Sequence, residues 1–94
     1  MRAMNNVFKD AIDFFGEDMQ INVAIEELSE LIKELCKHKR GCGDKMHIAE
    51  EMADVKIILQ ELEIIFDNKH RVNSWYEDKK KRLERNIAIE RALS

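Results

Sequence analysis

The sequence contains no proline and only three glycines, and just 6% of its 94 residues are aromatic. Because proline and glycine mark turns and interrupt regular elements, their scarcity argues against a fold of many short strands. Long hydrophobic runs are also missing, which argues against a membrane span, and the first ten residues lack the apolar stretch of a secretory signal peptide. We therefore expect an all-α, cytoplasmic protein made of long helices and short loops.

Charged residues are abundant, at 37% of the chain, yet the net charge is only −3. A slightly acidic protein has no overall attraction for nucleic acid or for an anionic membrane, so neither is an expected partner. A small anionic ligand would need a local cation to hold it. The length suits one domain, residues 1–94, because two domains of half this size could not each bury a core.

Hydrophobic periodicity predicts four helices. The expected elements are a helix over 4–15 that ends at Gly16, a helix over 18–39, a helix over 45–67 with Asp44 as its N-cap, and a last helix opened by a capping box of Ser74 and Glu77. The loop between the two middle helices makes them a helical hairpin, with flanking helices on either side. The third helix has apolar residues on two sides, so we expect a four-helix-bundle-type dimer or tetramer.

Of the two cysteines, Cys36 ends the helical pattern of residues 18–39 and Cys42 lies within the predicted hairpin turn. A disulfide between them is not expected in a cytoplasmic chain, where thiols stay reduced. A zinc site that adds His38 and His47 is an alternative, but the spacing matches no closed zinc pattern.

Two acidic pairs are the main functional signal: "ELSE" supplies Glu27 and Glu30, and "EMAD" supplies Glu51 and Asp54. Acid pairs at this spacing are no more frequent here than chance predicts, so their placement carries the information. On a helical wheel, Glu51 falls inside the apolar side of its own helix. Closing the hairpin brings the two pairs to nearly the same level along the helix axes, so four carboxylates can meet between the helices.

Carboxylates that cluster away from water are unfavourable unless a cation neutralises them, and a hard divalent cation with oxygen ligands does so. Mg²⁺ is the expected ion and Mn²⁺ the next candidate. Three other interpretations stay open. The acids could simply be solvated, Glu51 could form an internal ion pair with Lys79 or Arg82, or the site could be a di-iron carboxylate centre. Acid-x-x-His pairs, which a di-iron centre would want, occur only at the predicted helix ends.

The basic counterpart is "EDKKKRLER", residues 77–85. A solvated helix face is the ordinary interpretation of such a run. Because a carboxylate metal site needs cations to accept the rest of a polyphosphate, a phosphate-holding role for one or two of these side chains is a further interpretation.

Taken together, these residues resemble the MazG-like, all-α nucleoside triphosphate pyrophosphohydrolases. The pattern of that family is E-x-x-E followed, after a gap of roughly twelve to twenty-eight residues, by E-x-x-D. In this chain the gap runs from residue 31 to residue 50, and the resemblance covers about residues 18–66. The segment "YEDKKKRLER" resembles the basic Lys-x-x-Arg-Leu segment of small phage-type members.

The resemblance implies hydrolysis of a nucleoside triphosphate, and in particular a deoxynucleotide, to the monophosphate and pyrophosphate. It assigns Mg²⁺ binding and catalysis to four carboxylates and phosphate contacts to two cations: Glu27, Glu30, Glu51 and Asp54 in the first role, Lys79 and Arg82 in the second. Glu34, one turn beyond Glu30, is expected on the substrate side, acting through a metal-bound water.

The same resemblance implies a homodimer or homotetramer and a nucleoside triphosphate as the substrate. Candidates for base selection are the aromatic side chains of Phe14, Phe15 and Trp75. Two alternatives remain: phosphoribosyl-ATP pyrophosphohydrolase, and a helical oligomerisation or nucleotide-binding module without catalysis.

Overall fold

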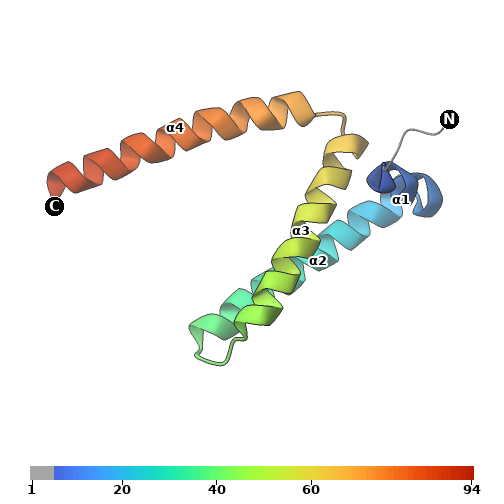
Figure 1. Ribbon diagram of the computed structural model, residues 1–94, viewed down its shortest axis with the longest axis horizontal. Coiled ribbons are helices and arrows are strands. Elements are labelled where there is room, and N and C mark those ends of the chain that lie inside the picture. Colours follow the sequence, from blue (N-terminus) through green and yellow to red (C-terminus); the bar gives the residue numbers. More distant parts are fainter. Residues whose placement is uncertain (1–5) are drawn as a thin grey trace.

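The computed structural model describes residues 6–94, which are helical apart from short connections (Figure 1). Four helices follow one another along the chain: α1 (Val7–Phe15), α2 (Glu17–Lys39), α3 (Lys45–Ile65) and α4 (Lys69–Leu93). The all-α class is therefore confirmed for the described residues. Residues 4 and 5, where the first helix was expected to begin, lie outside the described range.

A single residue, Gly16, joins α1 to α2. Its φ of 95° lies in the region that side chains with a Cβ rarely adopt, which is why glycine suits this sharp turn. The Gly16 amide donates to the Ile12 carbonyl at 2.8 Å and so closes the last turn of α1. At the other end, the Asn6 side chain accepts from the Lys9 amide at 3.1 Å and caps α1. The turn folds α1 back against the hairpin, where Ile12 is buried.

The helical hairpin of α2 and α3 is confirmed, and its loop explains the close approach of the two helices. Asp44 caps α3 as expected, since its carboxylate accepts from the Met46 amide at 2.9 Å. Gly41 has a φ of 82°. A Cβ on Gly43 would lie 2.6 Å from the Cα of His38, so the loop backbone packs directly on the end of α2.

The core of the described residues is small. Three apolar side chains are buried, one from each of the first three helices: Ile12, Ala24 and Ile58. Beside them the Gln20 side-chain amide donates to the buried carboxylate of Glu61 and links α2 to α3. Many large apolar side chains stay exposed on the same two helices, among them Ile25, Leu28, Ile32, Leu35, Met52 and Leu59.

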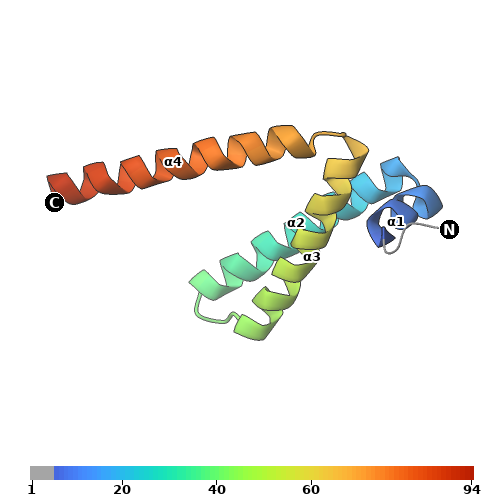
Figure 2. The same cartoon turned by 45° about the horizontal axis from the view of Figure 1, so that its top comes forward.

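The capping box predicted at Ser74 is wrong, because α4 begins five residues earlier, at Lys69. The corner between α3 and α4 is made by Asp67, whose φ of 47° is unusual for a residue other than glycine, and by Asn68. The Asn68 amide donates to the Glu63 carbonyl at 3.2 Å and holds the corner closed. From there α4 projects away from the hairpin (Figures 1 and 2); of the other described helices it touches only α3, and none of its residues is buried.

Candidate metal centre

Three acids of α2 lie on one side of the helix, and their side chains are buried to different extents. Glu27, Glu30 and Glu34 recur at steps of three and four residues, so they share one side of the helix. Glu30 is exposed, Glu27 is half-buried, and Glu34 is buried with 8% of its surface exposed. A carboxylate this buried is rarely unpaired, and the Lys37 amine donates to the Glu34 carboxylate at 3.4 Å.

Across the hairpin, α3 presents Glu51 and Asp54, both half-buried. The structure brings these two acids together with Glu27, because one carboxylate oxygen from each of the three lies within 4.8 Å of the others. Ligand oxygens placed about 2.1 Å from one Mg²⁺ would themselves be at most about 4.2 Å apart. Small side-chain rotations would therefore let all three oxygens reach a single ion.

The fourth predicted ligand, Glu30, is not part of this group of three. It is exposed at the edge of the cluster, yet it is close enough for its charge to act on both Glu27 and Glu51. The structure thus brings together three of the four carboxylates that the sequence singled out and leaves the fourth beside them.

Burial and the crowding of acids raise the pKa values of two of them, Glu27 and Glu51. Burial raises the pKa of Glu27 above its ordinary value of 4.5, and the charge and hydrogen bond of Asp54 add to the effect. The pKa of Glu51 is raised as well, first by burial and then by the charges of Asp54 and Glu30. Both shifts have the same physical origin, since each carboxylate loses water and meets like charge. One oxygen of Glu51, Oε2, is buried without a hydrogen-bond partner among the described residues.

A buried carboxylate oxygen without a donor is costly, and three negative groups within a few ångströms of one another raise that cost. A divalent cation would relieve both problems, because it supplies positive charge and accepts several oxygens at once. The chemistry of the donor set, all carboxylates, favours a hard ion such as Mg²⁺ or Mn²⁺. The residues present therefore fit the metal that the family resemblance implies.

A second group of ligands on α3 was missed in the sequence analysis. His47, Glu50 and Glu51 also offer ligand atoms within 4.8 Å of one another, so Glu51 belongs to both groups. The signal was present in the sequence, since residues separated by three and four positions are neighbours on a helix. Acids three residues before a histidine were the expected ligand pairs, so the acids that follow His47 were not predicted.

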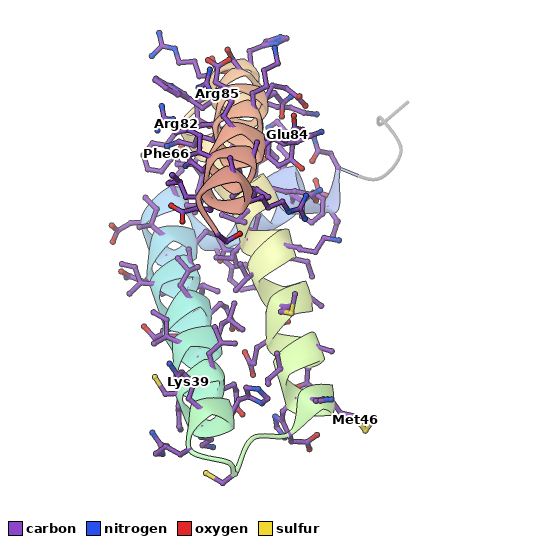
Figure 3. All side chains as sticks on the ribbon, turned by 90° about the vertical axis from the view of Figure 1, so that its left-hand side faces the viewer. Lys39, Met46, Phe66, Arg82, Glu84 and Arg85 are labelled. Atoms are coloured by element: carbon purple, nitrogen blue, oxygen red, sulfur yellow. The ribbon has the colours of Figure 1, made fainter. Side chains whose placement is uncertain are left out.

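The predicted phosphate contacts do not join the carboxylates within one chain. Lys79 and Arg82 lie on the projecting α4, where both are exposed. The Lys79 amine sits 5.8 Å from the centre of the Trp75 ring, a cation–π contact within its own helix. Figure 3 shows Arg82 at the end of the molecule away from Lys39 and Met46.

The aromatic candidates for base selection are on α1 and α4, whereas the carboxylates are on α2 and α3. Phe14 and Phe15 form an edge-to-face pair on α1, with ring centres 4.9 Å apart, and Phe14 is 82% exposed. Trp75 lines an open pocket of about 770 Å³ at the α3–α4 corner, together with Phe66, Asn68, Arg71, Val72, Tyr76 and Lys79.

Cys36 and Cys42 are free thiols, and both are exposed. Neither belongs to the two groups of possible ligands found among the described residues, so the zinc alternative gains no support. Over residues 6–94, no helix is long and apolar enough to cross a membrane. No protein-family model matches the chain, and neither a curated protein nor a solved structure matches it.

Proposed function

We propose that this chain is a Mg²⁺-dependent nucleoside triphosphate pyrophosphohydrolase of the MazG-like type, which converts a (d)NTP and water to a (d)NMP and pyrophosphate in the cytoplasm. The observation that carries the proposal is the convergence of Glu27, Glu51 and Asp54, whose ligand oxygens lie within 4.8 Å of one another. The reaction class comes from the resemblance of residues 18–66. The donor set supports it, because phosphate chemistry commonly uses a hard divalent ion held by carboxylates.

Each residue of the cluster has a part in this proposal. Glu27, Glu51 and Asp54 hold the ion, which when bound polarises the α-phosphate and lowers the pKa of the attacking water. Glu30, exposed beside them, accepts a proton from that water while the oxygen of the water bonds to the α-phosphorus. Glu34, fixed by Lys37, orients a water on the substrate side. The bridging oxygen then leaves with pyrophosphate, whose charge needs nearby cations.

Assembly is part of the proposal, and we infer a four-helix-bundle-type homodimer or homotetramer. The exposed apolar side chains of the hairpin argue for it: Ile25 is 58% exposed and Ile32 is 61% exposed on α2, and Met52 is 53% exposed on α3. A second hairpin packed on this side would cover them, as in helix bundles.

A second candidate is a helical assembly module without catalysis, which the same exposed apolar surface favours. Phosphoribosyl-ATP pyrophosphohydrolase is a third, which would use the same chemistry on a different substrate. Assembly alone would not separate these possibilities, since all three predict it. Measurements of turnover and of substrate choice would separate the three candidates.

The test is pyrophosphate release from a panel of dNTPs, NTPs and phosphoribosyl-ATP, with and without Mg²⁺. We expect release from at least one nucleoside triphosphate only when Mg²⁺ is present. Glu51→Gln and Asp54→Asn should each lower kcat by about a hundredfold or more, because each removes a charged ligand. The matched control is Glu26→Gln, an exposed acid on the same hairpin, which should leave turnover unchanged.

Two results would overturn the assignment. If Glu51→Gln and Asp54→Asn hydrolyse the substrate as fast as the unaltered chain, the carboxylate cluster is not the active site. If no compound of the panel is hydrolysed although the protein assembles, the non-catalytic module is the better description.

A further inference from the structure

The hairpin is acidic and α4 is basic, and within one chain these two surfaces do not pack against each other. Residues 17–67, which form the hairpin, carry 13 acids against 6 lysines and arginines, a net charge of −7. Residues 69–93, which form α4, carry 8 lysines and arginines against 4 acids, a net charge of +4. Opposite charges of this size attract over several ångströms, yet α4 touches the hairpin only where it meets the end of α3.

An exposed apolar stripe also runs along α4. Val72, Tyr76, Leu83 and Ile87 follow one another at steps of four and seven residues, so they lie on one side of the helix, and each is at least 40% exposed. Lys79 lies on the same side, between Tyr76 and Leu83. An amphipathic helix with an uncovered stripe of this length normally packs on another surface.

The carboxylate side of the hairpin has the complementary composition. Ile57 follows Asp54 by three residues and lies beside it on α3, with 46% of its surface exposed. Ile64, two turns further along the same side, is 38% exposed. A basic helix with an apolar stripe therefore matches an acidic surface that carries apolar neighbours.

The positions along the helices also match. Lys79 lies 11 residues after Asn68, and Asp54 lies 12 residues before Phe66. At about 1.5 Å per residue, both are some 16 to 18 Å from the corner between α3 and α4. An α4 helix laid antiparallel along α3 from such a corner would bring Lys79 and Arg82 to the level of Asp54 and Glu51.

The chain's own α4 is not in that position. Its corner is closed by the hydrogen bond from the Asn68 amide to the Glu63 carbonyl, and the helix points away from the hairpin (Figure 2). A second copy can present the same helix to the vacant surface, and twofold symmetry lets both copies do so at once.

We propose that α4 is exchanged between two copies of this chain. The α4 helix of one copy covers the carboxylate cluster of the other, with its apolar stripe on Ile57 and Ile64. Lys79 and Arg82 then face the carboxylates of the second chain, where they hold the phosphates of the substrate. This inference rests on the proposed function for the role of the two cations, whereas the exchange itself can be tested without any activity.

The activity test mixes two inactive chains. One carries Glu51→Gln and Asp54→Asn, and the other carries Lys79→Ala and Arg82→Ala. Each alone should lose most activity. If they are unfolded together and refolded in equal amounts, half of the dimers combine both chains and one of their two sites is intact, so about a quarter of the unaltered activity should return. If both cations act within their own chain, no mixed dimer contains an intact site, and the absence of recovery overturns the proposal.

A second test needs no turnover. Leu83 is replaced by p-benzoylphenylalanine, ¹⁴N-labelled and ¹⁵N-labelled chains are refolded together, and the mixture is irradiated. We expect crosslinks from Leu83 to the segment 47–55 that join a light chain to a heavy chain in about half of the products. Crosslinks that join only chains of the same label would show contact within one chain and would overturn the exchange.

Matched substitutions connect the exchange to assembly. Leu83→Asp places a charge in the stripe and should make the dimer dissociate at a higher protein concentration in light scattering, with helix content retained. Ala88→Asp adds the same charge to the opposite side of α4 and should leave the dimer intact. Equal effects of the two substitutions would contradict the docking of this stripe. If the unaltered protein hydrolyses no nucleotide, the proposed function fails, and the crosslinks still decide whether α4 is exchanged.

Discussion

The affinity of the cluster for a divalent cation should depend steeply on pH. The pKa of Glu27 and the pKa of Glu51 are both raised, chiefly by burial and then by the charges of neighbouring acids. Below its raised pKa, each carboxylate holds a proton that an incoming ion must displace. Above that pKa there is no proton to displace, and the affinity no longer depends on pH.

The magnitude follows from counting protons. Each group that must lose a proton lowers the association constant by up to about tenfold for every pH unit below its pKa. With Glu27 and Glu51 both titrating, the loss approaches about a hundredfold per unit. The affinity falls at every pH below the raised pKa values and levels off above them.

The sign of the effect on folding is the reverse of the usual one for an acid. Consider the window between pH 4.5, the ordinary pKa of a glutamate, and the raised pKa values of Glu27 and Glu51. In this window the folded metal-free protein binds more protons than the unfolded chain, so its stability falls as the pH rises. The melting temperature without metal should therefore be higher near the acidic end of the window than at pH 8. Mg²⁺ should raise the melting temperature most at pH 8, where the carboxylates are charged.

The assay is calorimetric titration with Mn²⁺ or Mg²⁺ between pH 4.5 and pH 8, in two buffers of different ionisation enthalpy, which reports the number of protons released. Glu51→Gln should reduce the limiting release from two protons to one and weaken binding at pH 8. Glu26→Gln, an exposed acid on the same hairpin, should change neither. An affinity that stays constant over this range, or equal effects of the two substitutions, would refute the reasoning.

Three further predictions concern the hairpin. Ile58→Ala should lower the free energy of unfolding by about 2–5 kcal/mol in urea titration, because Ile58 is buried in the hairpin. Gly43→Ala should lower the free energy of unfolding by about 1–3 kcal/mol, because the added Cβ forces the loop off the end of α2. Gly41→Ala should lower it by only about 1 kcal/mol, through backbone strain. Equal melting temperatures of the two variants would contradict this. Glu51→Leu should abolish hydrolysis but keep or raise the melting temperature in metal-free buffer, since it removes a charge that lacks a partner; a large loss of thermal stability would indicate a structural ion pair instead.

The helical hairpin could be predicted because its signals are local. A cap at Asp44, glycines in the loop and an apolar repeat near 3.6 residues each act within a few residues of themselves. The meeting of Glu27 with Glu51 and Asp54 followed from the same information, since a hairpin with a known turn has a known register. The start of α4 could not be predicted in this way, because the box at Ser74 and the earlier start at Lys69 are both compatible with the local sequence.

The sequence by itself determined that the chain is helical, that two helices form a hairpin, and that carboxylates from both sides of it come to one level. Only the tertiary structure decided that Glu34 is buried and that Glu30 stands at the edge of the cluster. It also decided where α4 points, through one corner at Asp67 and Asn68. The physical reason is that periodicity tells which residues share a side of a helix, whereas burial and direction depend on which other helix lies against that side.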